Sequence, residues 1–369
     1  MENNEILVIY GNEYKKMTKE LLEEADLAGR IGDRGKRIGI KPNLVSPVSA
    51  EEGATTHPEV VEGLLQYLRE HGFRELVIME GSWVGEKTEN AFRECGYREL
   101  AARYGAELID TQKEKSKTVD CAGMELHICQ CAFGVDYMIN VPVMKGHCQT
   151  RITCALKNMK GLIPNGEKRR FHSMGLHKPI AHLAMGIRQD FILVDSICGD
   201  LNFEDGGNPT AMNRIFAAAD PVLCDAYVCK LMGYGTEEVP YIGLAEKLGA
   251  GCADLSKGSV RELNTLGGSM AAPDKKRVMK LRELTAEVDS CSACYGYLLP
   301  ALDMLEKEGL LKHFSDKVCI GQGFRQKSGK LGIGNCTKDF QHSLPGCPPT
   351  ENEMYEFLKA YILSGSQRE

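Results

Sequence analysis

Hydrophobic and polar positions divide the first 275 residues into short apolar runs and amphipathic segments. The apolar runs predict buried strands at 5–10, 37–40, 75–79, 107–110, 136–141, 191–195 and 214–218. Many of these runs are followed by apolar residues three or four positions apart, as in 14–28 and 59–71, and this spacing predicts helices. Continuous apolar strands that alternate with helices are typical of a mostly parallel sheet covered on both faces. The pattern therefore predicts an α/β fold.

The stretch 137–161 concentrates polar side chains at a predicted junction between a strand and a helix. In an open α/β sheet, the carboxyl end of a strand followed by a helix N-terminus is where anions bind. We therefore expect a small anionic substrate here. The catalytic candidates are Lys145, His147 and Lys157, and the binding candidates are Thr150 and Lys160. The alternative is a solvated loop with two salt-bridging lysines.

Two other predicted strands end in candidate residues. Lys41 and Asn43 follow the second strand and are candidates for binding the same anion. Asp195 ends the sixth, where a carboxylate can accept a proton or orient a histidine, and the acidic, Gly-rich loop 199–213 follows it. The alternatives are that Pro42 stops its strand while Asn43 forms a local turn, and that Asp195 caps the next turn.

Histidines at two further places have weaker signals. His172 lies in a predicted basic loop over 162–177, where it could close over a carboxylate or phosphate, and the alternative is a mobile surface loop. His57 precedes the helix predicted at 59–71, and we interpret it as a capping or solvated side chain. We place only His172 among the substrate-binding candidates.

Composition limits the classes of function. The formal net charge of −6 argues against general nucleic-acid binding, which needs a basic surface. No apolar run of about 18 residues predicts a membrane span, and the acidic start has no basic signal-peptide region. Fifteen cysteines in a chain without a leader indicate a reducing compartment, so we expect a cytoplasmic protein of an anaerobe.

The C-terminal residues 276–369 are predicted to form a small cysteine-rich module. The candidate metal ligands are Cys291, Cys294, Cys336 and Cys347. The first two form a C-x2-C pair, and a Pro follows the last one, as in bacterial ferredoxins. We therefore predict a [4Fe–4S] cluster. The alternative is structural zinc, although zinc ribbons use two close cysteine pairs. Cys319 is a reserve fourth ligand.

The central stretch also carries a family resemblance. The pattern N-V-P-x-x-K-x-H-x-x-T-x-x-T-x-A-L-K-N-x-x-G resembles the bacterial and archaeal family catalogued as domain of unknown function 362. The segments 41–44, 194–195 and 219–226 fit the same pattern, and the resemblance covers roughly 36–235. Because members of that family are often joined to iron–sulfur modules, the resemblance implies the same pairing here. The C-terminal cysteine order is similar to that of iron–sulfur subunits of hydrogenases and respiratory dehydrogenases.

Three functions are compatible with these features. The first is an iron–sulfur oxidoreductase that acts on a small anionic substrate and exchanges electrons with a redox partner protein. The second is a non-redox isomerase or lyase whose cluster or zinc is structural. The third is an electron carrier without chemistry of its own. We expect the first, with no nucleic-acid or membrane partner.

Overall fold

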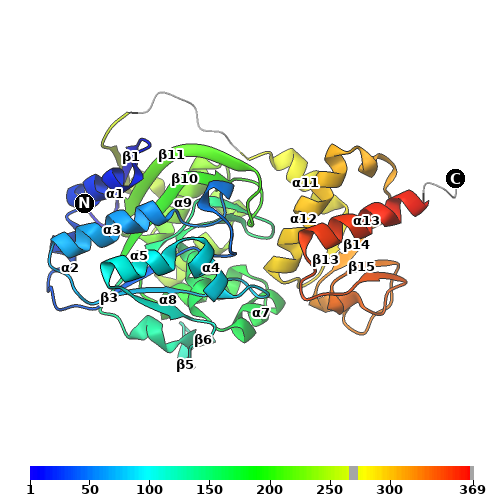
Figure 1. The fold of residues 1–369 in the computed structure, drawn as a ribbon, viewed down its shortest axis with the longest axis horizontal. Helices are drawn as coiled ribbons and strands as arrows, with labels where there is room; N and C mark the ends of the chain where they lie inside the picture. Colours follow the sequence, from blue (N-terminus) through cyan, green and yellow to red (C-terminus); the bar gives the residue numbers. More distant parts are fainter. Residues whose placement is uncertain (266–272, 366–369) are drawn as a thin grey trace. The chain divides into compact units, whose positions relative to one another are not determined.

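The computed structural model describes residues 1–265 and 273–365 and divides the chain into two compact units (Figure 1). The central unit comprises Met1–Lys168 and Leu176–Pro273. The cysteine unit comprises Asp274–Glu369 together with the short segment Arg169–Gly175. That segment is distant in sequence from the rest of the cysteine unit, yet it packs with it.

The central unit is organised around an eight-stranded sheet in the order β12-β1-β11-β10-β7-β2-β3-β4. Its strands are β1 (Glu5–Tyr10), β2 (Ile38–Pro42), β3 (Leu76–Glu80), β4 (Glu107–Asp110), β7 (Tyr137–Val141), β10 (Phe191–Asp200), β11 (Pro209–Ala218) and β12 (Ser259–Glu262). Within the described residues, five neighbouring pairs are parallel. Only the two pairs that β11 makes with β1 and β10 are antiparallel. The predicted α/β class with a largely parallel sheet is confirmed.

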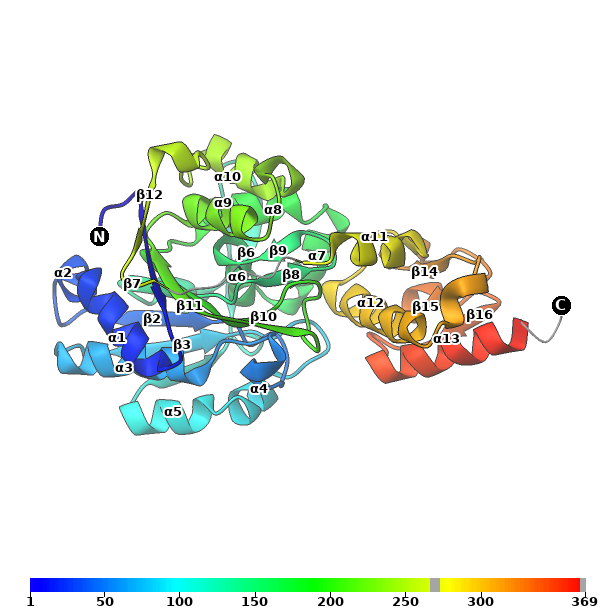
Figure 2. The same cartoon turned by 90° about the horizontal axis from the view of Figure 1, so that it is seen from above.

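Helices cover both faces of this sheet (Figure 2). One face carries α1 (Tyr14–Glu24), α2 (Leu27–Ile31), α3 (Pro58–Glu70), α4 (Thr88–Glu94) and α5 (Tyr97–Tyr104). The other carries α6 (Ala155–Asn158), α8 (His177–Gly186), α9 (Pro221–Leu231) and α10 (Tyr241–Leu248). Every residue of β2, β3 and β7 is buried, because strands covered on both faces have no solvent side.

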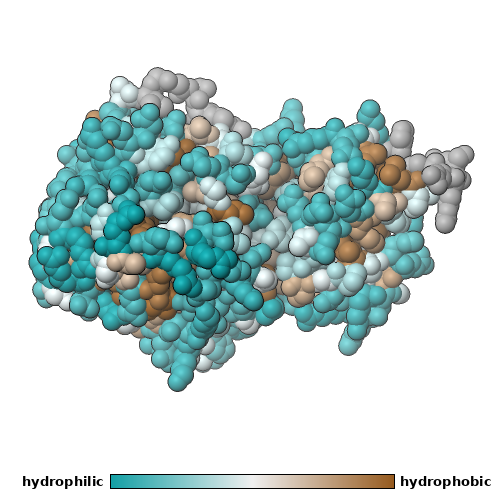
Figure 3. Space-filling model, viewed as in Figure 1, coloured by the Kyte–Doolittle hydropathy of each residue, from teal (hydrophilic) through white to brown (hydrophobic). Residues whose placement is uncertain are grey.

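A hairpin lies outside the central sheet. β5 (Ser116–Asp120) pairs with β6 (Glu125–Cys129), and the turn between them has positive φ angles at Ala122 (52°) and Gly123 (86°). On the face shown in Figure 3, hydrophilic residues cover most of the central unit. Among the helices that the structure describes, none combines the length and apolar character required to cross a bilayer.

Three local predictions were wrong. β7 is followed by a second hairpin, β8 (Lys145–His147) and β9 (Arg151–Thr153), before α6 begins. The predicted basic loop contains helix α7 (Asn165–Ser173), whose Phe171 is fully buried. The predicted loop after Asp195 shortens to 201–208, because β10 and β11 continue as an antiparallel ladder with an irregularity at 196–198. Each error concerns pairing or burial that local periodicity does not encode.

The cysteine unit contains a four-stranded, all-parallel sheet. Its strands, in spatial order, are β13 (Thr285–Glu287), β14 (Val318–Ile320), β15 (Leu331–Ile333) and β16 (His342–Leu344). The accompanying helices are α11 (Lys275–Glu283), α12 (Ser292–Lys307) and α13 (Glu351–Gly365). The register pairs Glu287 with Ile320, Ile320 with Ile333, and Ile333 with Leu344, so all four strands end at one edge.

Candidate functional site

Lys145 lies in β8 and is completely buried. Its ammonium donates hydrogen bonds to the carbonyl oxygens of Ala54 (2.6 Å) and Glu204 (2.9 Å) and to Asn43 Oδ1 (3.4 Å). Burial lowers the pKa of Lys145 to about 8, although Glu204 opposes the shift. The structure therefore brings two predicted site residues, Lys145 and Asn43, into direct contact.

His147 stands at the end of β8, and the turn of its own hairpin fixes its tautomer. The backbone N–H groups of Gln149 (2.9 Å) and Thr150 (3.0 Å) both donate to Nδ1. Nδ1 must therefore be an acceptor, and in the neutral ring the proton resides on Nε2. Nε2 lies 2.8 Å from Glu204 Oε2. Burial, above all, lowers the pKa of His147 to about 3, so the ring is neutral near pH 7.

Glu204 is the residue that joins the predicted catalytic side chains. Its Oε1 lies 2.6 Å from the ammonium of Lys157, which is buried in α6. Burial raises the pKa of Glu204, but His147 and Lys157 outweigh this effect and hold the pKa well below its usual value. Glu204 lies in the predicted acidic loop but was not among the predicted site residues, since Asp200 and Asp205 share the same context.

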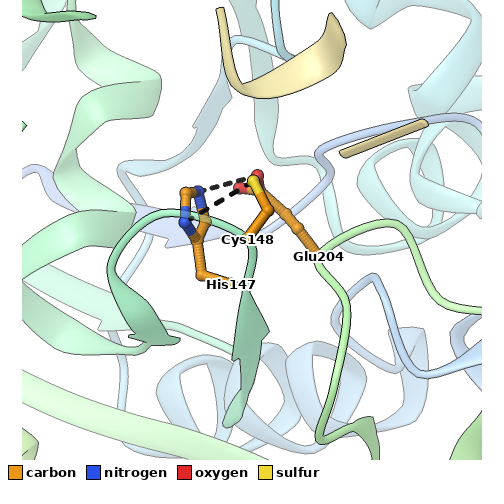
Figure 4. A group of neighbouring side chains, drawn as sticks. All are labelled: His147, Cys148 and Glu204. Carbon is orange, nitrogen blue, oxygen red and sulfur yellow. Dashed lines mark hydrogen bonds and ion pairs between the residues drawn. The ribbon is translucent and has the colours of Figure 1, made fainter. Parts of the chain in front are cut away.

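The structure describes two groups of three potential metal ligands whose atoms lie within 4.8 Å of one another. The first is His147, Cys148 and Glu204 (Figure 4). A metal would need the Nε2 lone pair, but the backbone donors at Nδ1 leave the proton on Nε2. The second is Cys154, Cys224 and Asp225. Burial raises the pKa of both thiols there, which disfavours the thiolates that a metal requires.

Lys41 lies in a buried network beneath these strand ends. Its ammonium is 2.8 Å from Glu80 Oε2, and burial lowers its pKa despite that partner. Asn158 donates to the carbonyl oxygens of Lys41 (3.2 Å) and Pro42 (3.4 Å). A Cβ at Gly161 would collide with the Glu80 carboxylate and the Lys41 side chain. Asn158 and Gly161, from the K-N-x-x-G part of the central motif, therefore pack directly against this network.

The remaining binding candidates from the central stretch differ in burial. Thr150 is completely buried, and its hydroxyl donates to the carbonyl oxygen of Ile152 (3.0 Å). Lys160 is half-buried in the 3-10 helix η3 (Met159–Leu162). Thr150 therefore belongs to the buried β8–β9 hairpin, whereas Lys160 is partly accessible to solvent.

Asp195 orients His57, which was predicted to be a capping or solvated side chain and not a site residue. Its Oδ2 accepts a hydrogen bond from the backbone N–H of His57 (2.7 Å) and lies 2.8 Å from His57 Nδ1. His57 precedes α3, as predicted for a capping position, but it is only 2% exposed and not solvated. Burial lowers the pKa of His57, yet the larger combined effect of Asp195 raises it overall. Asp195 lies within β10 rather than at its end.

The four C-terminal candidate ligands follow three strand ends of the cysteine unit. Cys291 comes after β13 and is the N-cap residue of α12, with Cys294 in its first turn. Cys336 is the third residue after β15, and Cys347 is the third after β16. Because parallel strands end at one edge, the four thiols share that edge. Cys319 lies in the middle of β14, paired with Gly332.

Two hydrogen bonds join the loops that carry Cys336 and Cys347. The backbone N–H of Asn335 donates to the Gly346 carbonyl (2.8 Å), and the Gly346 N–H donates to Asn335 Oδ1 (2.9 Å). Burial and the neighbouring thiols of Cys291, Cys347 and Cys336 raise the pKa of Cys294. Each of the other three thiols is therefore close enough to Cys294 to act on it electrostatically.

His172 belongs to the part of α7 that packs with the cysteine unit. It is 6% exposed, and its Nε2 lies 3.3 Å from both the backbone N and the Oγ of Ser292. Ser292 stands between Cys291 and Cys294. The structure therefore places this predicted substrate ligand beside the cysteine loop, within the cysteine unit.

These features define an α/β protein with a buried Lys–His–Glu network in its central unit and a second unit that gathers four cysteines at the edge of a parallel sheet. Residues 38–230 match the family described as "Domain of unknown function (DUF362)", and the chain belongs to that family. The resemblance given by the central motif is thereby confirmed.

One similar protein is the thylakoid-associated protein sll1697 of Synechocystis sp. It is 23% identical over 238 residues, which cover 63% of this chain and 74% of that protein. A lactate racemase apoprotein from Thermoanaerobacterium thermosaccharolyticum superposes with a TM-score of 0.44 and 16% identity, over 61% of this chain and 56% of that chain. A Thermotoga maritima protein superposes with a TM-score of 0.38 and 14% identity, over 81% and 80% of the two chains.

Proposed function

We propose that the protein is an iron–sulfur oxidoreductase that acts on a small anionic substrate. Its [4Fe–4S] cluster would be held by the cysteine unit through Cys291, Cys294, Cys336 and Cys347. The substrate would bind in the central unit, near the network of Lys145, His147 and Lys157. The single observation that carries the proposal is the gathering of four thiols at one edge of the parallel sheet.

The spacing of the thiols favours a cluster over zinc. Four sulfurs around one tetrahedral zinc, with Zn–S bonds of about 2.3 Å, would lie about 3.8 Å apart. The two groups of potential ligands found within 4.8 Å in the described part of the chain include none of these four cysteines. In a [4Fe–4S] cubane each thiolate binds a different iron, so the sulfurs stand farther apart. A set of four cysteine thiolates is what such a cluster requires, and this donor set supports the proposal.

The surrounding structure suits an anionic cluster. Cys291 stands at the N-terminus of α12, and Cys347 shortly precedes that of α13, and helix N-termini favour negative charge. The thiols of Cys336, Cys291 and Cys347 raise the pKa of Arg325, so a guanidinium lies close to these cysteines. When bound, such a cluster supplies one-electron transfer.

The buried network would provide charge and proton chemistry for the substrate. His147 can offer only its Nε2–H, so it acts as a hydrogen-bond donor and not as a base. Lys145, with a pKa of about 8, can exchange a proton near neutral pH. Lys160, half-buried in η3, and the buried Lys157 add positive charge that favours an anion. In this proposal Asp195 keeps His57 oriented beneath the same strand ends.

Anaerobic purification tests the cluster directly. We expect a brown protein with about four iron and four sulfide per chain and an electron paramagnetic resonance signal after reduction. Cys294→Ser should lose the cluster, whereas the matched control Cys319→Ser should keep it. A colourless protein with stoichiometric zinc would end the proposal. Turnover that needs no electron donor or acceptor would instead support a non-redox isomerase or lyase with a structural cluster.

A second candidate, an electron carrier, is favoured by one observation. All three hydrogen bonds found for the Lys145 ammonium go to protein oxygens. If the network only stabilises the fold, the chain would pass electrons to a redox partner protein without binding a substrate. Thermal-shift measurements against a panel of small carboxylates and phosphates distinguish the two functions. A rise in midpoint that Lys157→Met abolishes supports the enzyme, and no rise with any anion supports the carrier.

A further inference from the structure

The segment Arg169–Gly175 contacts two loops that follow strands in the rest of the cysteine unit. His172 Nε2 lies 3.3 Å from the backbone N of Ser292, in the loop after β13. Gln322, in the 3-10 helix η7 (Gln322–Phe324) after β14, donates from its side chain to the Arg169 carbonyl at 3.4 Å. Both contacts fall at the edge of the sheet that carries the four cysteines.

The Ser292 N–H is a donor that the helix itself cannot satisfy. Ser292 is the first residue of α12, and the first N–H groups of a helix have no intrahelical acceptor. The side chain of the N-cap residue Cys291 makes no capping hydrogen bond. His172 provides the acceptor from outside the helix, which requires that its Nε2 carry no proton. The Ser292 hydroxyl, also at 3.3 Å, can donate to the same nitrogen.

We propose that His172 is a positioning residue that fixes the Cys291–Cys294 half of the cluster site. It does so by holding the backbone of Ser292, the residue that follows Cys291 and begins the turn leading to Cys294. The inference rests on the proposed cluster and assigns His172 a role different from substrate binding. Its physical basis is general: groups that orient metal ligands from outside typically change metal affinity about 10- to 100-fold when they are removed.

The geometry of the loop permits a sharp test. Cys291 has φ −67° and ψ 142°, the extended conformation that a residue before proline adopts, and proline is well tolerated at the first position of a helix. Ser292→Pro should therefore remove the N–H donor while leaving the start of α12 intact. Ser292→Pro also removes the hydroxyl, so together with His172→Ala it forms a double-mutant cycle on the whole His172–Ser292 contact.

The experiment measures the rate of cluster loss in the anaerobically purified full-length protein during exposure to a chelator, followed by its visible absorbance. We expect His172→Ala and Ser292→Pro each to accelerate loss about tenfold or more, and the double variant to be no faster. His172→Gln, whose amide oxygen can accept the same hydrogen bond, should restore most of the lifetime. The matched control is His182→Ala, which removes a partly buried histidine of α8 in the central unit.

The outcomes separate this inference from the proposed function. An unaltered protein without a cluster contradicts the proposed function itself. A normal cluster whose lifetime is the same in His172→Ala and in the control contradicts the positioning role. Additive effects in the double variant would also overturn it, because two changes that remove the same His172–Ser292 contact should not add. If His172→Ala does not fold, His172→Gln is compared with Ser292→Pro. The positioning role then requires that His172→Gln keep most of the cluster lifetime and that Ser292→Pro shorten it.

Discussion

The two units differ in how far their polar side chains are buried and in what those side chains contact. In the central unit, Lys157, His147 and Glu204 are buried, and both Lys157 and His147 lie against the Glu204 carboxylate. In the cysteine unit, Cys291, Cys294 and Cys336 are half-buried and Cys347 is exposed, and hydrogen bonds between Asn335 and Gly346 join two of the loops that carry them. The buried network should contribute mainly to stability, whereas four thiols gathered at one edge can bind an additional group.

The largest effect that would test this contrast is the loss of Glu204. Glu204→Ala should lower the free energy of unfolding of the central unit by about 3–5 kcal/mol, because the Lys157 ammonium stays buried without its carboxylate. Chemical denaturation measures the change, with Glu99→Ala, an exposed change on α5, as the control. A loss below about 1 kcal/mol would show that the network is dispensable for stability.

Removal of the proposed cluster should lower the thermal stability of the cysteine unit alone. Binding of a ligand to the native state at about 1,000 times its dissociation constant stabilises that state by about 4 kcal/mol. Extraction with a chelator should therefore move the calorimetric transition of the cysteine unit to lower temperature and leave that of the central unit in place. A shift of both transitions together would contradict the independence of the two units.

A smaller effect depends on pH and on the His57–Asp195 pair. Because Asp195 holds the folded-state pKa of His57 above its unfolded value of about 6.5, the pair stabilises the fold fully below that pH. This contribution, on the order of 1 kcal/mol, should be lost as pH rises through the folded pKa. The difference in unfolding free energy between the native protein and His57→Gln should shrink accordingly. A difference that grows with pH would reverse the assigned direction.

The smallest expected effect lies beside the cysteines. Thr350 and Glu353 form a reciprocal cap at the start of α13, with the Thr350 N–H donating to Glu353 Oε2 at 2.7 Å and the Glu353 N–H donating to Thr350 Oγ1 at 3.3 Å. Thr350→Ala should cost about 1 kcal/mol in the cysteine unit and leave the iron content unchanged. Loss of iron with this variant would mean that the helix end itself supports the cluster.

Much of the fold could be predicted because periodicity is local. The runs that became β1 and β7 are visible as mostly apolar segments. The β8–β9 hairpin was missed because each of its strands has only three residues. Helix α7 was missed because its polar residues, 165–170, obscure the apolar side around Phe171.

The site divides in the same way. Lys145, His147 and Lys157 were found through their crowding in one stretch, and the spacing of the four cysteines marked them as a set. Glu204, Glu80 and His57 were not selected, because each meets its partner across a wide gap in sequence. A lone acid or histidine carries no local sign of its partner.

By itself, the sequence determined most of the longer strands and helices, which stretch concentrates cations and which cysteines stand beside Gly or Pro. These are properties of neighbouring residues, set by side-chain type and spacing. The tertiary structure alone decided which carboxylate faces each buried cation and that His172 faces the cysteine loop. Those contacts depend on strand order and packing between segments far apart in the chain, where burial makes partner choice a question of the whole fold.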